Sequence, residues 1–195
     1  MLSATETKYY TPEEYLALEE TSEDKNEYRQ GEIIPMVGAT TNHNQIAGNF
    51  YRRFPLTINN QDYYTYMETV RLWLSDYSIY TYPDVMVIKG QPLYQGNSQS
   101  NVINPLIIVE VLSNSTQAYD RGDKFKFYRS LPTFQEYILI EQSSYSVERY
   151  SKQKDDQWLV DFLTGENAVL QLVSVDWQIS LQDLYQRVNF DLAET

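Results

Sequence analysis

The chain has 195 residues, a formal net charge of −12, one histidine and no cysteine. The absence of cysteine excludes disulfides, a zinc site built from thiolates and a thiol nucleophile, and a single histidine excludes a His-rich zinc site. Any metal must therefore bind mainly through oxygen ligands, which favours Mg²⁺, Mn²⁺ or Ca²⁺.

Hydropathy and length bound the class of protein. No stretch approaches the ~20 apolar residues that a membrane-spanning helix needs, and the first residues have neither the basic region nor the apolar core of a signal peptide. We therefore expect a soluble cytoplasmic protein with no membrane partner. Because no stretch resembles a linker, we expect one domain over residues 1–195.

The negative charge argues against a nucleic acid partner, because phosphate binding depends on Lys and Arg. The charge is uneven, however. Residues 45–130 contain eight basic and seven acidic residues, and this excess of one positive charge leaves −13 for the rest of the chain. A dication bound in the middle segment would make that segment more positive. The alternative is that the acidity serves only solubility.

The first elements are short and peripheral. Thr11 is followed by proline and then by glutamate three residues after the cap, which predicts a helix from residue 11 to about 20. Residues 27–30 and 32–37 flank Gly31 and are typical of a hairpin or of two short edge strands.

The middle of the chain begins with a helix predicted over residues 41–59, which Pro55 should kink or end. Residues 63–74 alternate as one strand, and a second strand over 82–88 follows a short turn. Residues 89–104 form a polar loop that is long for a compact domain, which suggests a functional or mobile segment.

The next strand, over residues 106–112, leads to a helix predicted from about 120 to 130, with Asp120 as its N-cap and Pro132 after its end. After it we expect four strands and a last helix, at 135–141, 146–151, 158–163, 169–174 and 180–188. This order is that of an α/β or α+β fold, in which helices flank a central mixed β-sheet and an antiparallel C-terminal extension follows.

Glu110 is the most informative residue, because it lies within the apolar run of residues 106–112. Such a run is typical of a strand buried on both faces, where an unpaired carboxylate reduces the stability of the fold by several kcal/mol. The preceding strand carries a second acid, Asp84. In the right register the two acids can share an ion, as in a Mg²⁺ site with few protein ligands. Alternatively, Glu110 forms a structural ion pair with Lys124 or Arg121.

Lys124 is the third residue of this predicted site. Lys124, Phe127, Tyr128 and Leu131 follow helical spacing and form one stripe, so Lys124 lies on the inward, apolar face. A buried lysine needs an anionic neighbour, and the acidic pair is the natural candidate. Near a metal, Lys124 could orient or deprotonate a water, or stabilise charge on a phosphate. The alternative is a lysine whose stem covers the core.

These residues resemble a known group of enzymes. Pro83-Asp84, followed twenty-six positions later by Glu110-Val111-Leu112 on the two strands before a helix, resembles the PD-(D/E)XK nuclease superfamily. A longer frame over about residues 11–150 is more closely similar to the bacterial family of putative restriction endonucleases. It comprises Tyr28, Gly31-Glu32, His43, Pro83-Asp84-Val85, Val109 to Ser113, Asp120 through Lys124 to Tyr128, and Glu136-Tyr137.

The resemblance implies a restriction endonuclease-like core and a set of site residues. Asp84 and Glu110 would bind Mg²⁺ or Mn²⁺, with the Val111 carbonyl as a further ligand, and Glu32 would be an additional acid. Leu112 departs from the superfamily, since it occupies the place of the Lys in Glu-X-Lys. The closer family also lacks that lysine and places one on the next helix, where this chain has Lys124.

His43 falls in the first turn of a predicted helix, where a hydrogen-bonding role competes with an accessory role at the site. Our first hypothesis is thus a metal-dependent nuclease that hydrolyses DNA phosphodiester bonds. The rival hypothesis is a non-catalytic binding module with the same fold, active as a homodimer or larger homo-oligomer through its C-terminal strands. A hydrolase of small phosphorylated molecules is a third hypothesis.

Overall fold

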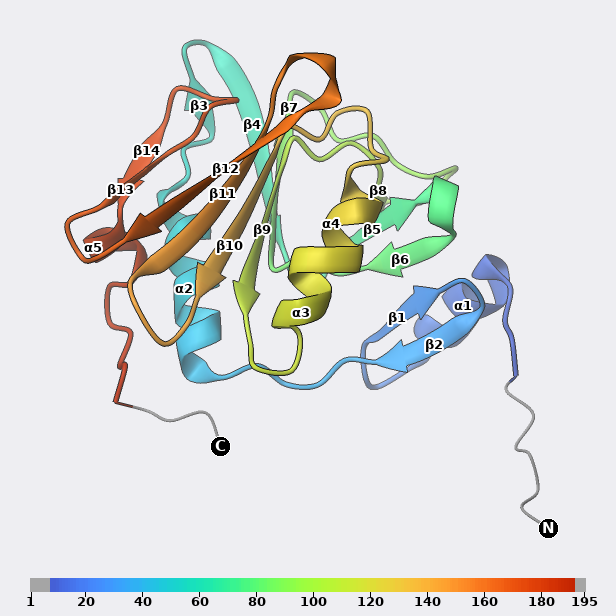
Figure 1. Cartoon of the computed structure of the whole chain (residues 1–195). Coiled ribbons are helices and arrows are strands. Elements are labelled where there is room, and N and C mark those ends of the chain that lie inside the picture. Colours follow the sequence, from blue (N-terminus) through green and yellow to red (C-terminus); the bar gives the residue numbers. More distant parts are fainter. Residues whose placement is uncertain (1–7, 192–195) are drawn as a thin grey trace.

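A computed structural model describes residues 8–191 of the chain (Figure 1). Its largest element is a mixed sheet with the strand order β12-β11-β10-β9-β7-β4-β3. Only β9 and β10 pair in parallel, and the other neighbours are antiparallel. The strands are β3 (Thr57–Ile58), β4 (Gln61–Met67), β7 (Val85–Lys89), β9 (Ile107–Leu112), β10 (Glu136–Glu141), β11 (Ser146–Lys152) and β12 (Trp158–Thr164).

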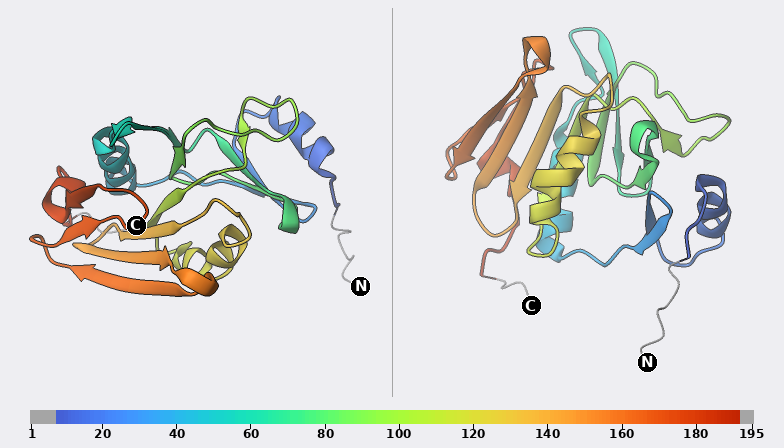
Figure 2. Two further views of the ribbon diagram at one scale, coloured as in Figure 1. Left: turned by 90° about the horizontal axis from the view of Figure 1, so that it is seen from above. Right: turned by 45° about the vertical axis from the view of Figure 1, so that its right-hand side comes forward.

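Helices cover both faces of this sheet (Figure 2). On one face lies α2 (Thr41–Arg53), and on the other lies a helical run of α3 (Gln117–Tyr119), the π-helical turn η2 (Asp120–Lys124) and α4 (Phe125–Tyr128). The strands alternate accordingly. Val85, Val87, Ile107 and Val109 pack with Ile46 and Phe50 of α2, whereas Met86 and Ile108 pack with Tyr128 of α4. Both central strands are therefore buried on both sides.

A second, five-stranded sheet has the order β2-β1-β6-β5-β8 and lies beside the helical run (Figure 1). Helix α1 (Pro12–Glu19) packs on it through Tyr15, whose ring stacks on those of Tyr28 and Tyr80 at 5.3 Å. Thr11 and Glu14 cap α1 reciprocally, as predicted. The sheet comprises β1 (Asn26–Arg29), β2 (Glu32–Pro35), β5 (Arg71–Leu74), β6 (Ile79–Thr81) and β8 (Asn101–Val102), with the 3₁₀ turn η1 (Ser75–Tyr77) between β5 and β6.

Residues 63–74 do not form the single strand that the sequence predicted. A turn at Glu68-Thr69-Val70 separates β4 from β5, which belong to different sheets. The two halves face different cores, because Tyr63 of β4 packs on the α2 side and Leu72 of β5 on the α4 side. Alternation within each half concealed the change of sheet.

The C-terminal part extends the large sheet in the antiparallel sense, as predicted, and ends in the ribbon β13 (Val169–Gln171) and β14 (Gln178–Ser180) and in α5 (Leu181–Leu184). The 3₁₀ turn η3 (Lys154–Asp156) joins β11 to β12. Helix α5 is shorter than predicted, since Tyr185 leaves the helical conformation and Arg187 has a positive φ of 69°. Across residues 8–191, the helices are too short and too polar to span a bilayer.

Candidate active site

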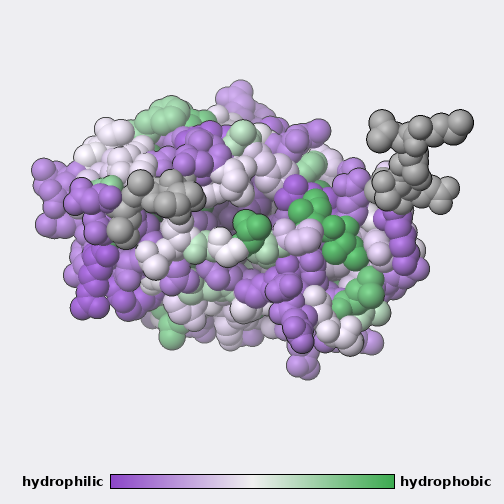
Figure 3. All heavy atoms as spheres, turned by 90° about the horizontal axis from the view of Figure 1, so that it is seen from below, coloured by the Kyte–Doolittle hydropathy of each residue, from purple (hydrophilic) through white to green (hydrophobic). Residues whose placement is uncertain are grey.

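A cleft of about 840 Å³ opens at the end of the large sheet where β7 begins and β9 finishes. Its walls are the β1–β2 hairpin, the segment 36–40 that leads into α2, and the segment 113–116 that leads into the helical run. Figure 3 views the molecule from below, onto this end, where mostly hydrophilic residues surround a hollow. The cleft brings together residues that lie far apart in sequence.

Asp84 and Glu110 meet because of the strand register. β7 and β9 pair with Val85 opposite Val109, and Asp84 precedes Val85 while Glu110 follows Val109. The two acids are thus opposite each other at the last step of the ladder, where side chains share a face. The Asp84 N–H lies 3.4 Å from Glu110 Oε2, and the Val111 N–H donates to Asp84 Oδ2 at 2.7 Å. The sequence prediction that these acids converge agrees with this geometry.

Lys124 reaches the same point from the helical run. Its Nζ lies 2.8 Å from Glu110 Oε1 and 3.3 Å from Asp120 Oδ1, and the Tyr128 hydroxyl donates to Glu110 Oε1 at 2.7 Å. Glu110 is only 3% exposed. Burial raises its pKa to about 8, Lys124 opposes that shift, and the charges of Asp84 and Asp120 reinforce it.

Lys124 itself remains an ammonium ion. Burial would lower its pKa, but Glu110 and then Asp120 outweigh burial and hold the pKa well above the usual value. Asp120, predicted as an N-cap, makes no capping hydrogen bond. It lies one turn inside a helical run that begins at Gln117, is buried, and pairs with Lys124. The cap prediction was therefore wrong.

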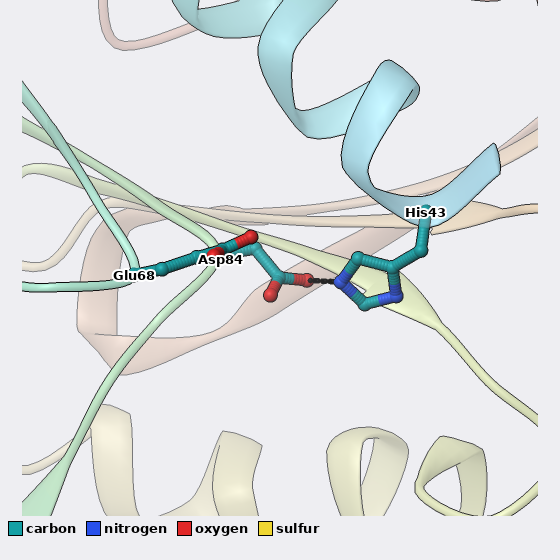
Figure 4. A group of neighbouring side chains, drawn as sticks. All are labelled: His43, Glu68 and Asp84. Atoms are coloured by element: carbon teal, nitrogen blue, oxygen red, sulfur yellow. Dashed lines mark ion pairs between the residues drawn. The ribbon is translucent and has the colours of Figure 1, made fainter. Parts of the chain in front are cut away.

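His43 and Glu68 complete the centre around Asp84 (Figure 4). His43 lies in the first turn of α2, which Thr40 caps, and its Nε2 lies 2.9 Å from Asp84 Oδ2. The hydrogen bond and charge of Asp84 outweigh burial and raise the pKa of His43. Glu68 directly follows β4. One ligand atom each from His43, Glu68 and Asp84 lie within 4.8 Å of one another.

Glu32 lies apart from this group. It is exposed on β2, opposite Arg29 at the turn end of the hairpin, and lines a separate cavity of about 360 Å³. The acid that the hairpin presents to the cleft is Glu27. Burial would raise its pKa, but Lys124 and Arg29 outweigh burial and lower it. Sequence reasoning missed Glu27 and Glu68, because a Gly-Glu pair drew attention to Glu32 and the single-strand prediction hid Glu68 within a strand.

The cleft carries an excess of negative charge that suits a cation. Among the residues that the structure describes, seven acidic and three basic side chains line it, a formal excess of four negative charges. Within residues 8–191, the Glu68 carboxylate has no hydrogen bond or ion pair, and Asp84 Oδ1 accepts none. Open carboxylate oxygens beside one imidazole are a donor set for Mg²⁺ or Mn²⁺. The residues present thus fit the metal that the fold implies.

The fold and the acidic pair at its strand ends define a protein of the restriction endonuclease-like class. A solved structure with the same fold is described as "a putative nuclease belonging to DUF820" from Anabaena variabilis. It aligns over 90% of this chain and 97% of its own, with a TM-score of 0.71 and 20% identity. At that identity the likeness establishes the fold alone.

The family follows from the sequence. Residues 12–182 match the family model Uma2, described as "Putative restriction endonuclease", and the chain belongs to this family. Two relatives come from Synechocystis sp. (strain ATCC 27184 / PCC 6803 / Kazusa). "Uncharacterized protein sll1609" is 46% identical over 88% of this chain and 97% of its own length, and "Uncharacterized protein slr1290" is 32% identical over 92% and 93%.

Proposed function

We propose that this protein is a metal-dependent nuclease that hydrolyses phosphodiester bonds of DNA by attack of water. The observation that carries the proposal is the meeting of Asp84, Glu110 and Lys124 at the wall of an open cleft. A structural ion pair would be expected in a closed, dry cluster instead. The large unpaired acidity of the cleft adds support, since a site that binds only a polyanion would be basic.

Asp84 and Glu110 would hold Mg²⁺ or Mn²⁺. The Val111 carbonyl remains a predicted ligand, and the structure adds His43 and Glu68 as candidates. A bound dication supplies two kinds of chemistry, a lowered pKa for a bound water and neutralisation of phosphate charge. Imidazole is a better ligand for Mn²⁺ than for Mg²⁺, so His43 favours Mn²⁺ where both ions are present.

Lys124 would stabilise negative charge on the phosphate. Burial would lower the pKa of Lys124, but the charges of Glu110 and Asp120 raise it, which favours an ammonium that donates to the phosphate over a general base. Glu110 and Asp120 fix the ammonium in place. Without a bound metal, His43 Nε2 contacts Asp84 Oδ2 and holds this carboxylate in place. Lys124 thus performs from the helix the role that Leu112 cannot perform from the strand.

One observation favours the rival function, a homodimeric binding module. Strand β12 is the outer edge of the large sheet, and its Phe162 is 72% exposed. An exposed aromatic side chain on an unpaired edge strand is a liability unless another surface covers it. Edge-to-edge pairing of β12 with a second copy would cover it. The dimer is compatible with hydrolysis, so this observation does not replace the nuclease.

The test separates metal binding from catalysis. Mg²⁺ and Mn²⁺ are titrated by calorimetry into the wild type, Glu110→Gln and Asp84→Asn, and a panel of single-stranded and duplex DNA is incubated with each protein. We expect binding and cleavage by the wild type only. The matched control is Glu148→Gln, because Glu148 is also a half-buried carboxylate in an ion pair at 2.8 Å but lies outside the cleft.

The possible outcomes discriminate between the hypotheses. Metal binding that depends on Asp84 and Glu110 without cleavage of any DNA would favour the binding module. Cleavage of small phosphate esters alone would favour the third hypothesis. If the wild type binds neither ion, the metal-dependent nuclease is refuted.

A further inference from the structure

Arg29 has an unusual position for an arginine in an acidic cleft. It lines both the large cleft and the smaller cavity of about 360 Å³, so this residue forms part of the wall between them. Its side chain is 29% exposed. No step of the proposed hydrolysis uses this residue, and its sequence context does not single it out.

Two contacts fix the guanidinium. Its Nε and Nη2 donate to Glu27 Oε2 at 3.2 and 2.5 Å, and Glu27 is in turn held by the Thr81 hydroxyl. The guanidinium carbon lies 3.9 Å from the centre of the Tyr119 ring, within cation–π distance. Glu27 thus occupies one edge of the guanidinium plane, and the Tyr119 ring occupies one face. Within residues 8–191, Nη1 donates no hydrogen bond.

The other two cations of the cleft are less suited to a phosphate contact away from the proposed metal centre. Lys124 is engaged by Glu110 and Asp120 deep in the wall. Lys25 is exposed at the rim, and among residues 8–191 its Nζ donates only to the Glu68 carbonyl, at 3.5 Å. Arg29 alone combines a fixed orientation, access to the cleft and an open N–H edge. A preoriented guanidinium binds phosphate with little loss of side-chain entropy.

We propose that Arg29 is a substrate-binding residue that donates through Nη1 to a phosphodiester oxygen of a nucleic acid strand in the cleft. Glu27 and Tyr119 are positioning residues, which hold the guanidinium by its edge and its face. This inference rests on the proposed function, since it assigns a phosphate contact to the same cleft. If Arg29 served only as a structural ion pair, any positive charge at this position would be enough to neutralise Glu27.

The experiment measures binding of a short, fluorescently labelled oligothymidine by anisotropy with Ca²⁺ in place of Mg²⁺, so that binding is measured separately from Mg²⁺-dependent cleavage. Arg29→Lys keeps the positive charge opposite Glu27 but removes the planar guanidinium that contacts Glu27 through two nitrogens and stacks on Tyr119. We therefore expect binding about tenfold weaker, as for the loss of one hydrogen bond to a charged group. The matched control is Arg53→Lys. Arg53 is paired with Asp183, is 23% exposed and lies outside the cleft, so its variant should bind like the wild type.

Tyr119 provides the second pair of variants. Tyr119→Phe keeps the ring beside the guanidinium and should bind more tightly than Tyr119→Leu, which removes the stack. Thermal unfolding of each variant shows whether it is folded. Equal affinity of Arg29→Lys and wild type would overturn the inference, and so would a wild type that does not bind the oligonucleotide.

Cleavage of the same oligonucleotide is followed in parallel. Arg29-dependent binding without cleavage would reject the proposed nuclease activity and keep the phosphate site. Cleavage by the wild type with unchanged KM and kcat in Arg29→Lys would keep the nuclease and reject the role of Arg29. The two failures are therefore distinguishable.

Discussion

Lys124→Met tests whether the ammonium compensates the buried acids. Methionine is close to lysine in length, so the change removes the charge with little loss of packing. Glu110 and Asp120, which are 3% and 2% exposed, would then lack their cationic partner. Removal of one partner from a buried ion pair costs about 3–5 kcal/mol, which for a chain of this size lowers Tm by roughly 6–20 °C.

The loss should depend on pH. Without Lys124 the folded-state pKa of Glu110 rises further above the ordinary value, so folding takes up a proton wherever the unfolded carboxyl is ionised. Because the pKa of Glu110 is already about 8 in the wild type, Glu110 is protonated in both folded proteins below that pH, and the stability of the variant falls relative to wild type only as pH rises above about 8. Replacing Glu110 as well, in Lys124→Met/Glu110→Gln, removes one buried charge and should recover part of the stability.

Urea unfolding gives the free energy of unfolding of the wild type and of each variant, with EDTA present so that no metal ion contributes. The control is Lys152→Met, since Lys152 also pairs with an aspartate four residues away, at 2.8 Å, but on the surface with Asp156 81% exposed, so we expect little change. A Lys124→Met variant as stable as the wild type, or a double variant no better than the single one, would refute the assignment of Lys124 as the compensating charge.

Three further predictions concern the hairpin, its turn and the sheet edge. Glu27→Gln should lower stability at pH 7. The deficit should begin to shrink as pH falls below about 4.5, the unfolded value, and disappear only below the lowered folded-state pKa of Glu27; urea midpoints in a series from pH 7 downward check this, and a deficit that stays constant would contradict it. Gly31→Ala should lower the free energy of unfolding by about 1–3 kcal/mol, since φ is +103° and the new Cβ would lie 2.7 Å from the Tyr9 ring. The control Gly48→Ala in α2 meets no atom within 4 Å and should not destabilise the protein, and thermal unfolding of both variants tests this. Phe162→Ser should convert a homodimer to monomer in light scattering, and Leu56→Ser, at a side chain equally exposed, should not; a wild type that is monomeric excludes the β12 dimer.

The elements that place the acidic pair were predictable because their sequences are locally consistent. The apolar run around Glu110 could only be a buried strand, and the strand that follows Asp84 has the same composition. Their pairing still required a register, which the sequence does not encode locally. A shift by one residue would have turned one acid to the opposite face.

The residues that sequence reasoning missed depend on long-range placement. Glu68 lies at the site because β4 ends just before it, where the chain leaves the large sheet and turns toward the second sheet. Glu27 and Glu32 are both hairpin acids of unremarkable sequence context, and only the packing of the hairpin against the helical run decides which one faces the cleft. Neither decision leaves a periodic signal in the sequence.

The departure at Leu112 has a geometric explanation. Leu112 points to the same side of β9 as Ile108 and Glu110, and there it packs in the core with Tyr128. A lysine at that position would have to displace an apolar contact of the helical run. In this chain the π-helical turn η2 brings Asp120 and Lys124 to the same strand end, so the ammonium meets Glu110 from the helix. The charge beside the acid is thus preserved in space while its position in the sequence changes, which explains why a motif search confined to β9 would overlook it.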